Sequence, residues 1–192
     1  MRYTSNMKIH LVTATIEDLQ LIVDILNTGM RNKVRRGDLA WGMTDLKVEP
    51  IEQMIANSMF YIAYNESTPV GTCALSWEDP QMWGKQPNDA GYIQRFATSA
   101  NYKGQGVGGQ IIKQLLIEVS KMNRQYLRLA VPSSNMKLRT YYENQGFVRA
   151  DHRIASPIYP AYSAAYYEQT TSIPSDTTPV SKSNIFKRFF NK

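Results

Sequence analysis

Apolar residues recur at helical spacing in two long stretches of the chain. The first stretch has them three or four positions apart, which places them on one face of a helix: Leu19, Ile22, Val23, Leu26 and Met30. Thr15 and Asp18 precede this run with the spacing of a capping box, so the helix is predicted to begin there. The second stretch, residues 107–122, has Ile112, Leu115, Leu116 and Val119 on one face.

Runs rich in β-branched and aromatic residues predict the strands. Residues 60–77 form two such runs about a turn at residues 65–69, which predicts a hairpin. Further strands are predicted at residues 8–14, 92–98, 126–132, 147–151 and 165–169. Shorter helices are predicted over residues 50–57 and 137–144, and residues 35–45 and 78–91 are predicted loops. Interleaved strands and helices indicate an α/β fold.

The length fits one domain with a short appendage. The chain has 192 residues, of which 43% are hydrophobic, enough to bury one core. Residues 171–183 are rich in Ser, Thr and Pro without periodicity. We therefore expect a domain over residues 1–170, followed by a flexible linker and basic tail over residues 171–192.

Cysteine usage and charge exclude several classes of protein. The single cysteine, Cys73, leaves no internal disulfide framework and favours a reducing compartment, so we expect a cytoplasmic protein. His10 and His152 have no partners at ligand spacing, so we predict no metal site. We expect no membrane span, because no stretch approaches the roughly 18 apolar residues required. Half of the net charge of +6 lies in residues 171–192, and the remaining +3 does not argue for nucleic-acid binding.

Four glycines crowd the start of the second helix, in the sequence NYKGQGVGGQII. A glycine turn at a helix N-terminus exposes backbone N–H groups to an anion, which predicts a phosphate ligand. A Walker loop is excluded, because Gln110 and Ile111 replace its lysine and hydroxyl residue. Gly104, Gly106 and Gly109 match a dinucleotide fingerprint, but they do not follow the strand directly and the next strand offers no acidic residue.

Two segments in order resemble the GNAT superfamily of acyl-CoA-dependent N-acyltransferases. Lys103-x-x-Gly106-x-Gly108 is similar to its pyrophosphate loop, with lysine where arginine or glutamine is usual. Downstream, Asn135, Leu138, Tyr142, Gly146 and Phe147 resemble its second CoA-contacting segment, with leucine where alanine is commoner. The resemblance implies a mixed, mostly antiparallel sheet flanked by helices, with a parallel βαβ unit at the cofactor site.

The same resemblance implies roles for individual residues. Tyr142 is the expected general acid, since a phenol can protonate a departing thiolate, although the buried face of a helix would also explain it. Asn135 would contact the cofactor arm, cap the next helix, or do both. The expected CoA contacts are the strand residues Phe96, Ala97 and Thr98, the loop residues Lys103, Gly104, Gln105, Gly106, Val107 and Gly108, and also Asn135 and Tyr142.

The candidates for the general base do not belong to either of these two segments. Glu78 is the predicted base, with Asp79 and Asp89 as alternatives, and Tyr92 stands about where some family members have a glutamate. Aromatic and acidic residues in predicted loops suggest a pocket for an amine, although aromatic residues that cover a half-exposed core would give the same pattern. The predicted acceptor-binding residues are Trp41, Trp77, Asp79, Trp83 and Tyr159, with Asp45, Glu78 and Tyr162 beside them.

The sequence thus predicts an N-acetyltransferase that moves an acetyl group from acetyl-CoA to a primary amine in a direct ternary complex. The acceptor is a small molecule or a protein amine, and a homodimer fits the family. Two alternatives stay open: a non-catalytic acyl-CoA sensor and a nicotinamide-dependent oxidoreductase.

Overall fold

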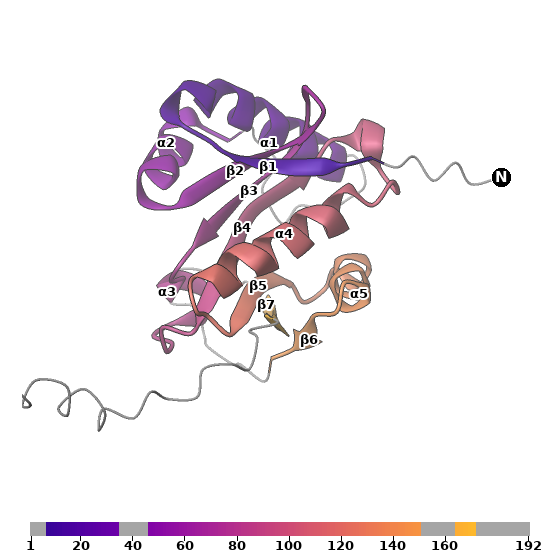
Figure 1. Ribbon diagram of the computed structural model, residues 1–192. Coiled ribbons are helices and arrows are strands. Elements are labelled where there is room, and N and C mark those ends of the chain that lie inside the picture. Colours follow the sequence, from indigo (N-terminus) through magenta and orange to yellow (C-terminus); the bar gives the residue numbers. More distant parts are fainter. Residues whose placement is uncertain (1–6, 35–45, 151–163, 172–192) are drawn as a thin grey trace, which may run out of the picture.

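One mixed sheet organises the chain, with strands in the order β1-β2-β3-β4-β5-β7-β6 (Figure 1). The computed structural model describes residues 7–34, 46–150 and 164–171. The strands are β1 Ile9–Thr13, β2 Met59–Asn65, β3 Thr68–Ser76, β4 Ala90–Thr98, β5 Tyr126–Pro132, β6 Val148–Arg149 and β7 Ala164–Thr170. Neighbouring strands are antiparallel except β4 and β5, which are parallel. The predicted mixed, mostly antiparallel α/β fold is confirmed.

Helices cover both faces of this sheet. They are α1 Leu19–Val34, α2 Val48–Asn57, α3 Pro80–Trp83, α4 Val107–Lys121 and α5 Met136–Asn144. Strand alternation divides the core between the two faces. On β2, Phe60 and Ile62 pack with α1 and α2, whereas Tyr61 and Ala63 belong to the cluster that α4 covers. The apolar stripe predicted for α4 is buried against that second face.

Most of the predicted elements are present with small shifts at their ends. The capping box is confirmed: the Thr15 N–H donates to Asp18 at 2.8 Å, and the Thr15 hydroxyl accepts from the Glu17 N–H at 3.3 Å. The short helix α3 lies in a segment predicted to be a loop. Pro80 opens it, and the Asp79 side chain caps it by accepting from the Met82 N–H.

Helix α4 also covers the outer edge of β1. The side-chain oxygen of Gln110 accepts from the Ile9 N–H, and that of Gln114 accepts from the Leu11 N–H, both at 3.1 Å. The Gln114 amide donates to the Ile9 carbonyl at 2.9 Å. Because an uncovered edge strand exposes unpaired backbone groups, these contacts both protect β1 and fix the position of α4.

Several predicted features fall outside the described residues. Trp41, Asp45, Tyr159 and Tyr162 are among them, and so are residues 172–192. Thr171, the first residue of the predicted linker, is buried, and its hydroxyl donates to the Arg124 carbonyl at 2.7 Å.

Candidate active site

The sheet opens between β4 and β5. Parallel pairing joins residues 90–92 of β4 to residues 126–128 of β5, and their register extends no further. Beyond that point, among the residues that the structure describes, β4 pairs only with β3, as far as Thr98, and β5 pairs only with β7, as far as Pro132. The edge of β4 that faces β5 therefore presents backbone N–H and C=O groups to the opening.

A β-bulge lies in this part of β4. Thr72 and Ala74 of β3 pair with Ala97 and Gln94, so β4 has one extra residue between the pairs. Arg95, within the bulge, has a φ of 49°, in the left-handed region that residues with side chains rarely adopt. A bulge turns backbone groups out of the ladder, and strained backbone of this kind is concentrated at functional sites.

The glycine loop lies at the end of this opening, between β4 and α4. Gly104 and Gly106 have φ values of 78° and 81°, which only glycine adopts at little cost. A Cβ placed on either residue would meet nothing within 4 Å, so the space above both Cα atoms is open. Gly106 is the N-cap of α4, and the first N–H groups of a helix have no acceptor within it. The loop therefore has the geometry of an anion site.

The next two glycines serve a different purpose. A Cβ on Gly108 would collide with the Tyr141 hydroxyl, and one on Gly109 would lie 2.5 Å from the Gln145 side-chain oxygen. Both partners belong to α5 or its C-cap. A side chain on Gly108 would thus displace the Tyr141 ring, whether or not Gly108 also contacts a cofactor.

Helix α5 is fixed at both of its ends. The Asn135 side chain accepts from the Leu138 N–H at 3.0 Å, so its predicted capping role is confirmed. The Tyr167 hydroxyl of β7 donates to Glu143 at 2.7 Å and accepts from Arg139 at 3.2 Å. These contacts hold α5 against the sheet and orient Tyr142.

Tyr142 is the buried residue of α5, with 6% of its surface exposed. Its ring packs edge-on against Tyr141 and Phe147, at centroid distances of 5.2 and 5.6 Å. Burial raises the pKa of Tyr142 strongly, and the neighbouring Tyr141 and Cys73 raise it further. Cys73 lies on β3 between the two residues that flank the bulge of β4. Tyr142 and Cys73 belong to the same buried cluster.

Comparison with known families agrees with this arrangement. A model of the acetyltransferase (GNAT) family matches residues 30–147, more than half of the chain. The chain belongs to the GNAT family. As a member it is an acyltransferase, and the matched range includes β4, the glycine loop, α4, β5 and Tyr142. The resemblance inferred from the two sequence segments is confirmed.

Solved structures of GNAT enzymes share the fold at low sequence identity. An acetyltransferase of the family from Listeria monocytogenes has a TM-score of 0.71 and 19% identity, covering 86% of this chain and 96% of its own. Spermidine N-acetyltransferase from Vibrio cholerae, solved with CoA and spermine, has a TM-score of 0.63 and 16% identity; the match covers 85% of this chain and 96% of that enzyme's chain. The ribosomal-protein-S18-alanine N-acetyltransferase from Escherichia coli has a TM-score of 0.63 and 14% identity; the match covers 88% of this chain and 98% of that enzyme's chain. No curated protein matches the sequence.

The three carboxylates considered as the general base of this GNAT protein have different surroundings. Glu78 is exposed. Asp89 forms an ion pair with Arg128 at 2.8 Å. Asp79 is partly buried, and burial raises its pKa, while hydrogen bonds from the Met82 N–H and the Gln94 side chain act in the opposite direction. Asp79 is thus linked through Gln94 to the strand that carries the bulge.

A cavity of about 350 Å³ adjoins Asp79. Its lining residues include Trp77, Glu78, Asp79 and Tyr92, and also the positively charged Lys85. Trp77 and Asp79, both predicted from the sequence, thus meet at one cavity. Trp83 is not among the lining residues: it is 2% exposed and packs edge-on against Tyr92 and Tyr166.

Sequence reasoning missed two polar residues beside this site, Gln94 and Arg128. For Arg128 the signal was present, since a charged residue at a central position of the apolar strand Tyr126–Pro132 requires partners when buried.

Within the described ranges, no group of three or more His, Cys, Asp or Glu side chains is arranged to hold a metal ion. In the same ranges, none of the helices has the length and apolarity required to cross a membrane.

Proposed function

We propose that this GNAT protein transfers an acetyl group from acetyl-CoA to a primary amine in a direct ternary complex. The observation that carries the proposal is the opening between β4 and β5. The unpaired edge of β4 and its bulge border this opening, and the glycine loop lies between β4 and α4 in the chain. Acetyl-CoA supplies the acetyl group as an activated thioester. The coenzyme arm fits the opening, with its pyrophosphate at the start of α4.

The donor contacts follow from this placement. Main-chain groups of Phe96, Ala97 and Thr98 hydrogen-bond the arm, because this edge of β4 has no strand partner in the described part of the chain. Residues Lys103 to Gly108 surround the pyrophosphate, with Gly104 and Gly106 leaving room for it. Exposed Lys103 adds a positive charge at the loop. Asn135 contributes by holding the first turn of α5 in place.

Tyr142 protonates the departing thiolate. The cluster around it also contains Cys73, whose thiol pKa burial raises to about 12. Burial raises the pKa of the Tyr142 phenol, so it carries its proton at neutral pH, as a general acid must. Cys73 itself is fully buried and protonated, which argues against an enzyme-bound acyl thioester.

Asp79, rather than the exposed Glu78, removes the proton from the amine. Tyr142 belongs to the core cluster on the α4 face of the sheet, and Tyr166, which Asp79 influences electrostatically, belongs to the aromatic cluster around Trp83. Direct transfer uses a base that takes a proton from the amine and a separate acid that gives a proton to the thiolate. Burial raises the pKa of Asp79, which makes the carboxylate a better proton acceptor.

The acceptor is an amine with an apolar body. The cavity beside Asp79 combines two acidic side chains and one lysine with the aromatic rings of Trp77 and Tyr92. This combination suits an ammonium group on a hydrocarbon or aromatic carrier. Both the spermidine and the ribosomal-protein acetyltransferases named above act on amines, so the acceptor is a small molecule or a protein amine.

Calorimetric titration with acetyl-CoA, CoA and NADH tests the donor. Binding of acetyl-CoA and CoA but not NADH is the expected result, and binding of NADH alone would indicate an oxidoreductase. An amine panel with detection of released CoA thiol then tests transfer. Suppose that acetyl-CoA binds tightly but no CoA thiol is released when polyamines, amino acid derivatives or peptide N-termini are offered as acceptors. That result would favour an acyl-CoA sensor.

A further inference from the structure

Three neighbouring strands place polar side chains at one level of the sheet. Arg128 of β5 pairs with Tyr92 of β4 on one side and with Glu168 of β7 on the other. Asp89 lies just before β4, and its carbonyl accepts from the N–H groups of Gln125 and Tyr126 at 2.7 and 3.0 Å. The row therefore joins β4, β5 and β7 through side chains as well as backbone.

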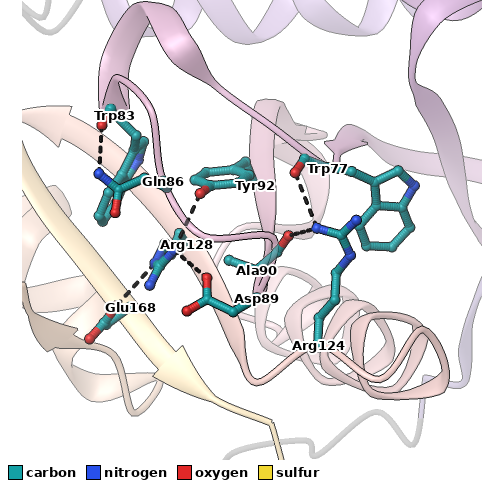
Figure 2. A network of polar contacts seen from close by, with 9 residues as sticks. All are labelled: Trp77, Trp83, Gln86, Asp89, Ala90, Tyr92, Arg124, Arg128 and Glu168. Atoms are coloured by element: carbon teal, nitrogen blue, oxygen red, sulfur yellow. Dashed lines mark hydrogen bonds and ion pairs between the residues drawn. The ribbon is translucent and has the colours of Figure 1, made fainter.

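Arg128 is the centre of this row, as Figure 2 shows. Its guanidinium donates to Asp89 at 2.8 Å, to Glu168 at 3.1 Å and to the Tyr92 hydroxyl at 3.3 Å. The ring centroids of Tyr126 and Trp83 lie 4.9 and 5.4 Å from the guanidinium carbon. Only 7% of Arg128 is exposed. A buried charge is tolerated when it is paired and hydrogen-bonded, as it is here.

The row coincides with the end of the pairing between β4 and β5. The pair Tyr92–Arg128 is the last in the register of β4 and β5. The next residues, Ile93 and Leu129, pair with β3 and β7 and not with each other. The bulge of β4, with Arg95 in the left-handed region, lies just beyond this level. The fork of Arg128 holds both strands together at the last pair and so marks the closed end of the opening.

We propose that Arg128 is a positioning residue that fixes how far β4 and β5 open, and thereby the depth to which the acyl-CoA arm enters. This inference rests on the proposed function. Tyr92 extends the effect to the acceptor side, because it belongs to both the row and the wall of the cavity. One set of contacts therefore sets the relative position of the two substrates.

Three substitutions weaken the row to different degrees. Tyr92→Phe removes one hydroxyl, Glu168→Gln removes one charge, and Arg128→Lys keeps the charge but loses the planar fork. Arg124→Lys is the matched control. Arg124 donates to the Ala90 and Trp77 carbonyls at 2.7 and 3.2 Å and stacks on Trp77, and neither residue belongs to the row.

The measurements are the Kd of CoA by calorimetry and the KM and kcat for acetyl-CoA, well below each melting temperature. We expect Arg128→Lys to raise both Kd and KM at least fivefold, with smaller increases for the other two variants, and Arg124→Lys to stay within twofold of wild type. A purely structural role would lower the melting temperature and the active fraction without changing KM.

Equal CoA affinity in wild type and all folded variants of the row would overturn the inference, as would an equal loss in Arg124→Lys. If Arg128→Lys does not fold, Tyr92→Phe and Glu168→Gln decide on the same criterion. Failure of the wild-type protein itself to bind CoA would instead refute the proposed function.

Discussion

The Tyr141 hydroxyl occupies the space that a side chain on Gly108 would need. We therefore expect Gly108→Ala to be destabilising by about 1–3 kcal/mol, the usual cost of overpacking, despite the better helix propensity of alanine. Tyr141→Phe removes the obstructing atom and should restore part of this loss in the double variant. Urea unfolding of the four proteins measures the coupling, and additive effects would show that the two residues do not compete for space.

Substitutions at Gly106 separate backbone strain from charge. Asn and Asp tolerate the positive φ of this position about equally, but only Asp places a negative charge at the start of α4. We expect CoA to bind Gly106→Asp at least tenfold more weakly than Gly106→Asn at low salt, with a smaller difference in high salt. Equal affinities by calorimetry would place the pyrophosphate elsewhere.

Replacement of Tyr142 by phenylalanine tests the general acid. Its hydroxyl contributes to proton transfer, so we expect Tyr142→Phe to lower kcat by about 10²-fold or more with little change in CoA affinity. Tyr141→Phe is the matched comparison, since its hydroxyl faces Gly108, and a much smaller loss is expected. Single-turnover kinetics measure the rate of the chemical step separately from product release. Equal losses in the two variants would remove Tyr142 from this role.

The choice between Asp79 and Glu78 is open to a direct comparison. Asparagine still caps α3, so Asp79→Asn should keep CoA binding while kcat falls by about 10²-fold. Since burial raises the pKa of Asp79, activity should be lost as the pH falls through a value above its ordinary 3.8, and this limb should vanish in the variant. Should Glu78→Gln alone abolish turnover, Glu78 would be the base.

Cys73 makes the stability of the fold sensitive to alkaline pH. Burial raises the pKa of its thiol from 9.0 to about 12, so its contribution to stability is complete below pH 9 and is lost as the pH rises toward 12. The free energy of unfolding should fall there by at most about 1.4 kcal/mol per pH unit from this group. Denaturant unfolding at pH 8, 9 and 10 should show a shallower decline for Cys73→Ala. Parallel declines would show that the thiol does not titrate differently on folding.

Much of this protein is determined by local sequence. The capping box at Thr15, the stripe that α4 buries and the glycines at Gly104 and Gly106 act over a few residues, so they could be predicted without any knowledge of the fold. The order of the two family segments likewise predicted the mixed sheet.

Tertiary structure alone decided the relations between distant residues. Three such relations involve elements that are separate in the chain. They are the opening after Tyr92 and Arg128, the contact of Tyr141 with Gly108, and the hydrogen bond between Asp79 and Gln94. The proposal of Asp79 as the base, rather than Glu78 or Asp89, rests on burial and partners, which the sequence of the loop does not reveal. Local propensities determine which elements form, whereas the site depends on how the elements pack, and packing is a property of the whole fold.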